Sequence, residues 1–289
     1  MPETSPTAAI LPAKVRKPLP STLVWGCSLM APILALVLLA PWIVPYPFDE
    51  MHNVARLTPP SADFWLGTDD YGRDVLSRTL IGGRASLMLG VVATTVSLAL
   101  GVPLGLLAGY AGRRVDSLIM RVMDVLMSFP PILFGVLILA FSTPSLLKAA
   151  FAVGVIYVPS IVRITRIVTM ELASEEFVVA ARARGETTLY ILLHEILPNA
   201  WPPIIVEGSL RITFAILLGA SLSFLGMGAQ PPSSDWGLMI SEARPFLLIA
   251  PWIALVPGIA MAFTVIGVNL IGDGLREWLD PHFNGRGHK

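Results

Sequence analysis

The charged side chains in or beside the long apolar runs are the residues of this chain best placed to do chemistry. Asp124 follows Arg121 by three positions and Arg211 follows Glu207 by four, so each pair lies on one face of a helix. Ionisable groups in a membrane are expensive and often serve in proton relays. Each pair can neutralise itself near the end of its apolar run, where long side chains reach water. We therefore favour structural pairing over a proton relay.

Metal, nucleotide and nucleic-acid chemistry find little support in the sequence. The histidines are dispersed at His52, His194, His282 and His288, and Cys27 is the only cysteine, which predicts neither a metal site nor an intrachain disulfide. A phosphate-binding G-x-x-x-x-G-K-[ST] loop does not occur. The formal net charge of +0 gives no electrostatic reason to bind nucleic acid. We expect this chain itself to bind no metal or cofactor.

The composition is that of a membrane protein. The chain is 54% hydrophobic and 14% charged, whereas about a quarter of the residues in a soluble domain are charged. Apolar runs of about 20 residues predict transmembrane helices. We expect an all-α integral membrane protein with about six of them, at 23–45, 86–110, 117–141, 149–168, 203–226 and 249–271. This divides the chain into a basic tail (1–22), a first span (23–45), an external loop (46–83), a core membrane domain (84–275) with a cytoplasmic loop at 172–200, and a C-terminal tail (276–289).

Basic residues predict the orientation, because cytoplasmic loops carry an excess of Lys and Arg. With the N-terminus inside, most of the 20 basic residues fall on the cytoplasmic side: Lys14, Arg16, Lys17, Arg113, Arg114, Arg121, Arg163, Arg166, Arg182, Arg184, Arg276, Arg286 and Lys289. Fewer fall outside: Arg56, Arg73, Arg78, Arg84, Lys148 and Arg244. Both chain ends and the 172–200 loop are therefore expected to be cytoplasmic.

The polar segment between the fourth and fifth predicted spans has its own pattern. Residues 175–199 read EEFVVAARARGETTLYILLHEILPN. Gly185 suits the left-handed conformation that ends a helix, and Pro198 cannot continue one. Ser174 is a suitable N-cap. We predict two short helices, capped at Ser174, broken at Gly185 and stopped at Pro198.

This segment resembles the EAA loop of ABC importer permeases. The likeness rests on the spacing from Ala180-Ala181 to Gly185 and on to an Ile-Leu-Pro triplet. The sequence departs from the motif at Val179, where a Glu is usual, and at Glu195, where an Ile is usual. The resemblance implies docking to a cytoplasmic ATPase through Ala180, Ala181, Gly185, Glu195, Ile196, Leu197 and Pro198.

Four further segments narrow the family. They read LGTDDYGRDVLSRTLIGGR at 66–84, LLAGYAGRRVD at 106–116, SLSFLGMGAQPPSSDWG at 221–237 and NLIGDGLREWLDP at 269–281. With the loop, they resemble the C-type permease subunit of dipeptide, oligopeptide and nickel importers over about residues 60–283. This resemblance implies the type I ABC importer permease fold and a bacterial inner membrane location.

The resemblance also implies a mechanism and its partners. The chain would be the permease subunit of an ATP-driven importer of peptides or related small solutes, working by alternating access. Partners would be a second homologous permease, two ATPase subunits that bind ATP and Mg, membrane lipid and an extracytoplasmic solute-binding protein, so this chain is not itself an enzyme. The alternative is a secondary transporter driven by an ion gradient. That class needs coupling carboxylates near the bilayer midplane and often internal repeats, neither of which is evident.

Two further groups of candidate residues follow. Small polar side chains in the spans are candidates for the translocation pathway: Ser128, Ser221, Ser223 and Asn269. Serines there also serve helix packing or internal hydrogen bonds. The external segments offer candidate contacts for the binding protein or the second permease at Asp69, Asp70, Arg73, Asp74 and Trp236. The alternatives are a turn whose Asp and Arg residues cap neighbouring helices and a Trp that anchors at the interface.

Overall fold

The computed structural model describes residues 19–279, and these are helical with no β-strand among them. Most of the predicted N-terminal tail, the end of the C-terminal tail, and His282 and His288 lie outside this range. The α-helices are α1 (Ser21–Ile43), α2 (Val75–Tyr110), α3 (Arg113–Met127), α4 (Pro131–Leu139), α5 (Leu146–Leu172), α6 (Glu176–Ala183), α7 (Thr188–Tyr190), α8 (Leu197–Phe224), α9 (Trp236–Ala243) and α10 (Trp252–Leu279). Shorter helical turns are η1 (Asn53–Ala55), the π-helical η2 (Ile191–Ile196) and η3 (Arg244–Phe246).

Five helices are long and apolar enough to cross a membrane: α1, α2, α5, the run from α7 through α8, and α10. The predicted third span at 117–141 is wrong as a single helix. It is a broken pair, in which α3 and α4 meet at 90°. The break falls at Pro130 and Pro131, which supply no backbone N–H to continue the α3 ladder. Counted as one span, the pair gives the sixth candidate.

Two predicted helix boundaries also change. Helix α2 begins at Val75 rather than at residue 86, because the Asp74 carboxylate accepts the Ser77 N–H at 2.8 Å and caps the helix. Pro198 does not stop a helix. It lies in the first turn of α8, directly after the π-helical η2, and the helix continues through it.

Glycines let α2 and α5 pack most closely at the centre of the molecule. Gly101, Gly105 and Gly109 of α2 face Ile161, Thr165 and Thr169 of α5. A Cβ added at Gly105 would lie 2.5 Å from the Thr165 Cβ, which is closer than real side chains approach. Close backbone contact of this kind is typical of membrane helix pairs, where small residues allow tight dispersion packing.

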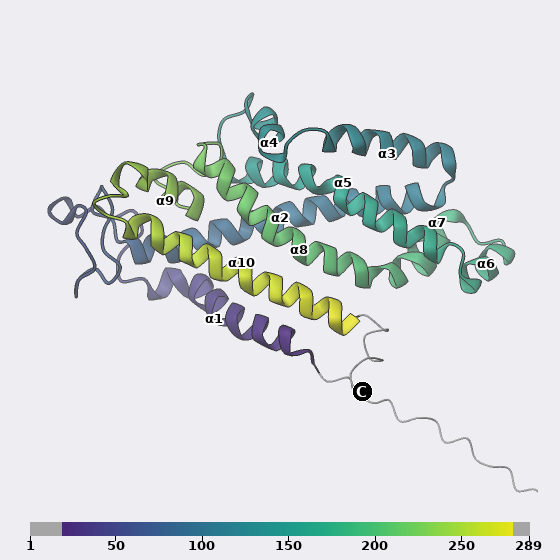
Figure 1. Cartoon of the computed structure of the whole chain (residues 1–289), viewed down its shortest axis with the longest axis horizontal. Helices are drawn as coiled ribbons and strands as arrows, with labels where there is room; N and C mark the ends of the chain where they lie inside the picture. The colour runs from purple at the N-terminus through teal and green to yellow at the C-terminus, as the bar shows by residue number, and fades with distance from the viewer. Residues whose placement is uncertain (1–18, 280–289) are drawn as a thin grey trace, which may run out of the picture.

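The molecule has two distinct ends along its long axis (Figure 1). One end carries α9 and the chain before α2, and we call it the α9 end. The opposite end carries α6 and α7, and we call it the α6 end. The first turn of α1 and the last turn of α10 point toward the α6 end, although they stop well short of α6 and α7 (Figure 1), and the Thr22 hydroxyl donates to Glu277 Oε2 at 3.1 Å. Both ends of the described chain and the 172–200 segment therefore share one side.

Candidate coupling site, external cap and pathway residues

Helix α6 ends in a glycine turn, as the sequence predicts. Gly185 has φ +81°, its N–H donates to the Arg182 carbonyl at 3.1 Å, and the Glu186 N–H donates to the Ala181 carbonyl at 3.2 Å. These two bonds form a Schellman motif. The predicted cap at Ser174 is wrong: Glu175 occupies the N-cap position, and the Ser174 hydroxyl donates to the Glu171 carbonyl instead.

After the glycine turn, the chain forms one continuous helical run, Thr188–Phe224, that is a candidate membrane span. The Thr187 hydroxyl oxygen accepts the Tyr190 N–H at 3.3 Å and caps α7. The next residues, Ile191–Ile196, form a π-helix, whose wider turn is frequent at functional sites. This π-helix runs directly into α8.

The inner face of this segment is anchored in the protein core. Val178 and Ala181 of α6 are fully buried, as is Ile196 of η2. They pack in one cluster with Val102, Leu106, Ile161, Ile191, Leu192, Ala200 and Ile204. Because this cluster joins α6 and η2 to α2, α5 and α8, the segment is rigidly mounted on three long helices.

The outer face of the same segment is apolar and open. Val179 of α6 is 52% exposed and Leu189 of α7 is 66% exposed, and Leu193 of η2 is exposed as well. The rings of Tyr190 and His194 stack at 4.6 Å. We call Val179, Leu189, Tyr190, Leu193 and His194 the coupling face. Exposed apolar side chains grouped on a rigid mount are typical of a protein interaction surface.

Arg184 connects the two halves of the segment. Its guanidinium lies 3.2 Å from Glu195 Oε1 and 3.7 Å from Glu186 Oε1. Arg182 contacts Tyr110 at the end of α2, with its Nε 3.3 Å from the phenol oxygen. These polar contacts are solvent-exposed, so the buried cluster contributes more to the rigidity than they do.

The seven predicted coupling residues separate into two groups. Ala181 and Ile196 are buried and mount the segment, whereas Ala180, Gly185 and Pro198 are exposed. Glu195 and Leu197 are half-buried. Leu189, the most exposed apolar side chain of the segment, was missed because the motif gives it no role. Val179 was noted only as a departure from the motif. The signal that could have found both is their position opposite the buried apolar residues.

The α9 end is closed by a buried network of charges. Asp69 Oδ2 lies 2.6 Å from both Arg73 Nε and Arg78 Nη1. Glu242 Oε2 of α9 lies 2.9 Å from Arg78 and 3.3 Å from Arg73. The Asp69, Arg73 and Arg78 side chains are between 1% and 4% exposed. We call Asp69, Arg73, Arg78 and Glu242 the cap network.

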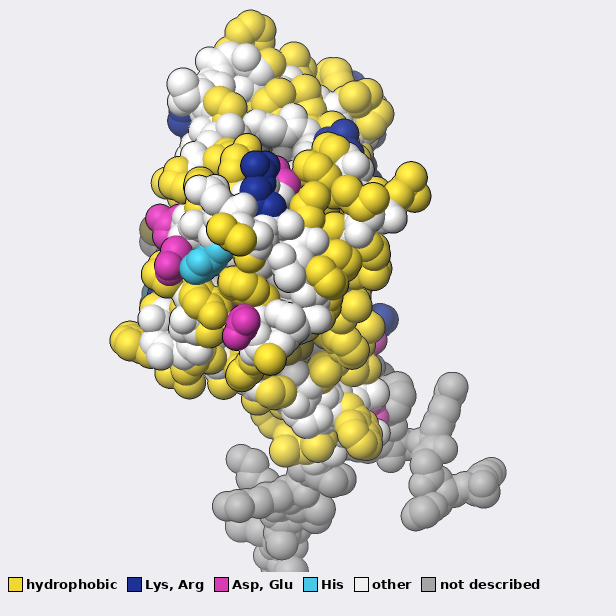
Figure 2. Space-filling model, turned by 90° about the vertical axis from the view of Figure 1, so that its left-hand side faces the viewer, with side chains coloured by type: hydrophobic (Ala, Val, Ile, Leu, Met, Phe, Trp, Pro, Cys, Tyr) yellow, Lys and Arg dark blue, Asp and Glu magenta, His cyan; other side chains and the backbone are white. Residues whose placement is uncertain are grey.

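This burial corrects the predicted external contacts. Asp69, Arg73, Asp74 and Trp236 are too deeply buried to contact a partner directly. Asp74 instead caps α2, and the Trp236 indole N–H donates to the Thr79 carbonyl at 2.9 Å. These contacts fit the alternative interpretation, in which the Asp and Arg side chains of the turn serve neighbouring helices. Viewed onto the α9 end, charged side chains are sparse among hydrophobic ones (Figure 2).

Two carboxyls at the α9 end, half-buried Asp70 and buried Asp235, have raised pKa values. Burial raises the pKa of Asp70 above its usual 3.8, and the nearby negative charge of Asp69 raises it further. Burial also raises the pKa of Asp235, although its Oδ1 accepts the Gly237 and Leu238 N–H groups at 2.8 and 3.1 Å. Asp235 thereby caps α9 at a cost in ionisation free energy.

The four predicted pathway residues do not share one cavity. Ser128 is exposed at the end of α3, and Asn269 is half-buried on α10. Ser221 lines a hollow of about 550 Å³ between α4, α8, α9 and α10. Ser223 is fully buried, so the structure argues against a pathway role for its side chain.

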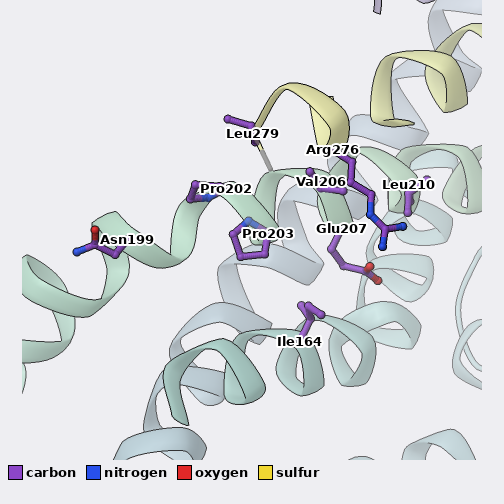
Figure 3. A pocket seen from close by; sticks show the side chains of 9 residues that line it. All are labelled: Ile164, Asn199, Pro202, Pro203, Val206, Glu207, Leu210, Arg276 and Leu279. Atoms are coloured by element: carbon purple, nitrogen blue, oxygen red, sulfur yellow. The ribbon is translucent and has the colours of Figure 1, made fainter. Parts of the chain in front are cut away.

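One predicted ion pair is confirmed and the other is wrong. Glu207 Oε1 lies 2.6 Å from Arg211 Nη2 on α8. Asp124 pairs with Arg163 of α5 at 2.6 Å rather than with Arg121, because the neighbouring helix places a guanidinium within reach. Glu207 also faces a second hollow of about 550 Å³ between α5, α8 and α10, into which Arg276 points (Figure 3).

Sequence and structure comparisons identify the family. The model of the binding-protein-dependent transport system inner membrane component matches residues 101–285. The chain belongs to this family. It is 43% identical over 256 residues to the dipeptide transport system permease protein DppC of Alkalihalophilus pseudofirmus, covering 89% of this chain and 84% of that protein. It is 40% identical over 250 residues to the glutathione transport system permease protein GsiD of Pectobacterium atrosepticum, covering 86% and 83%.

A solved structure shares the fold of this permease. An inward-facing form of the MetNI methionine ABC transporter matches with a TM-score of 0.60 at 17% identity, covering 70% of this chain and 96% of that chain. The all-α type I permease fold is thereby confirmed. The protein is a multi-pass permease subunit of the ABC transport class in the inner membrane, and hence not itself an enzyme.

Proposed function

We propose that this permease forms half of the translocation pathway of an ATP-driven importer for peptides or related small solutes. The substrate class follows the names of its relatives, which transport dipeptides, di- and tripeptides or glutathione. We place the α6 end in the cytoplasm, because the basic residues of the α2–α3 connection and of α6 lie there. Both chain termini would then be cytoplasmic.

The coupling face carries the proposal. It presents apolar side chains on a segment anchored to α2, α5 and α8. We assign it as the docking surface for two ATPase subunits or domains, which supply the bound ATP and Mg. A second homologous permease would complete the pathway, and an extracytoplasmic solute-binding protein would deliver the solute.

The geometry supplies a route for the motion. Because η2 runs into α8 without a break, a displacement of the coupling face moves the α6 end of α8 as a rigid body. The buried cluster transmits the same displacement to α2 and α5. Closure of the ATPase pair would in this way change which side of the membrane the pathway opens to.

Charge placed on the coupling face tests the proposal. Leu189→Glu should weaken co-purification of the ATPase subunits and ATP-driven uptake, since it puts a carboxylate into an apolar interface. The control is Leu248→Glu, because Leu248 is 99% exposed at the α9 end. Both variants should insert into the membrane normally. Unchanged ATPase association in Leu189→Glu would contradict the assignment.

The alternative of an ion-driven transporter predicts a different outcome. The chain reconstituted alone in liposomes should neither hydrolyse ATP nor move solute. Uptake by the isolated chain under a proton or sodium gradient would favour the alternative. Uptake that needs ATP but no binding protein would keep the importer class and remove the delivery step.

A further inference from the structure

Helix α3 has three distinct faces. Its inner face packs Met123 against Val158 and Val162 of α5. A second face exposes apolar side chains, among them Leu118 at 67% and Val125 at 61%. The third face is polar, which is unexpected for a helix that forms a candidate membrane span together with α4.

The polar face is a continuous stripe. Ser117, Arg121, Asp124 and Ser128 recur at intervals of four, three and four residues, which places them along one side of a helix. All four are exposed. Arg163 of α5 joins them through its 2.6 Å bond to Asp124. We call these five residues the polar stripe.

The Asp124–Arg163 pair lies at membrane depth. Helix α5 has 27 residues, about 40 Å at 1.5 Å per residue, against a hydrocarbon core of about 30 Å. Arg163 lies about 14 Å before the end of α5 at Leu172, so it falls inside the hydrocarbon when α5 is centred in the bilayer. The two side chains are nevertheless 43% and 60% exposed.

Charges so exposed at this depth require water or polar protein opposite them, because hydrocarbon does not solvate them. The apolar face of α3, exposed to a similar extent, suits lipid instead. The hollow with Glu207 and Arg276 is lined by α8 and α10 and by Ile164, the residue next to Arg163 on α5. Arg163 therefore lies next in sequence to a residue that lines this hollow, whose polar lining residues are Asn199, Glu207 and Arg276.

The charge balance of the stripe favours anions. Asp124 neutralises Arg163, and Arg121 has no ion pair with any residue in the range 19–279. The stripe thus carries one uncompensated guanidinium, a group suited to binding carboxylates.

We propose that the polar stripe lines the α6-end half of a water-filled translocation passage, and that Arg121 attracts solutes bearing a carboxylate group as they leave. The assignment rests on the proposed import function for its substrate class. Its two tests measure water access and local charge rather than transport, so they can fail or succeed independently of uptake.

Water access is measured by thiol labelling of the assembled transporter in inside-out membrane vesicles. In a Cys27→Ala background, the paired variants are Ser117→Cys and Ser128→Cys on the stripe against Leu118→Cys and Val125→Cys on the apolar face. A membrane-impermeant methanethiosulfonate should modify the stripe positions at least about tenfold faster, because thiols ionise in water and not in lipid. Equal rates on both faces, whether fast or slow, would overturn the proposal.

Local charge is measured at Ser128→Cys with an anionic and a cationic methanethiosulfonate. Arg121→Gln should lower the ratio of anionic to cationic rates about threefold, the effect of one charge about 10 Å away. The control Arg114→Gln removes a charge roughly 21 Å away, more than two Debye lengths of about 8 Å, whereas Arg121 lies little more than one Debye length away, so the control should leave the ratio nearly unchanged. An unchanged ratio in Arg121→Gln would overturn the role of Arg121.

Discussion

The two ends of this permease differ in which side chains they bury and which they expose. At the α9 end, arginines and carboxylates are buried in the cap network and bind one another. At the α6 end, the exposed Arg184 pairs with the half-buried Glu195, and apolar side chains of the coupling face are exposed. The charged groups of the cap network are paired within the protein, whereas the α6 end leaves apolar surface uncovered.

This difference separates stability from partner binding. Breaking a buried ion pair is expensive because it strands a charge, whereas an exposed pair contributes little. The cap network should therefore dominate folding energetics, and the coupling face should dominate assembly. Variants at matched positions in the two ends can break or sharpen this distinction.

The largest effect is expected at the cap network. Arg78 is 1% exposed and binds both Asp69 and Glu242. Arg78→Gln should destabilise the protein by about 3–5 kcal/mol, because buried Asp69 and half-buried Glu242 lose one of the two guanidinium groups that they share. The matched control Arg184→Gln, at a 55% exposed side chain, should cost less than about 1 kcal/mol. Thermal unfolding in detergent compares them, and equal losses would remove the distinction between the ends.

A smaller effect is expected at the glycine turn of the α6 end. Gly185→Val forces a β-branched residue to φ +81° and should cost about 1–2 kcal/mol of local strain. Gly112 offers a matched position, with φ +94° and, like Gly185, nothing near a new Cβ. Gly112→Val should show similar strain, but only Gly185→Val should reduce solute-stimulated ATP hydrolysis. Equal loss of coupling in both variants would argue against a specific role for the α6 turn.

The Glu207–Arg211 pair, with side chains 19% and 17% exposed, is intermediate in burial between the cap network and the exposed Arg184 pair. Glu207→Gln or Arg211→Gln alone should each cost about 1–2 kcal/mol, less than a fully buried pair, because partial solvation remains. The double variant should cost less than the sum of the two. A double-mutant cycle on folded yield and unfolding temperature measures this, and strictly additive losses would exclude the pairing.

The smallest effect is a pH dependence at the α9 end. Burial raises the pKa of Asp235 above 3.8, so the native state holds its proton more tightly than the unfolded state does. Its contribution to stability is therefore most favourable at low pH and is lost as the pH rises above 3.8 through the raised pKa. Asp235→Asn should flatten this part of the stability–pH curve. Parallel curves for the variant and the parent protein would contradict the prediction.

The sequence predicted the membrane class, most of the spans and the glycine turn that ends α6. It did so because apolar run length and Gly185 act locally, over a few turns of chain. The local rules failed where a neighbouring helix intervened. Asp124 has Arg121 on its own face, yet Arg163 of α5 binds it. The 117–141 run is apolar enough for one span, yet Pro130 and Pro131 divide it.

What the sequence alone determined is therefore how much of this chain belongs in a membrane, where helices break, and which family it resembles. Only the tertiary structure decided that Asp69 and Arg73 are buried while Leu189 and Ser128 are exposed. The reason is physical: hydropathy depends on a residue's own side chain, whereas burial and ion pairing depend on contacts made across large separations in sequence. The cap network joins Asp69 to Glu242 in this way, and no local pattern specifies that meeting.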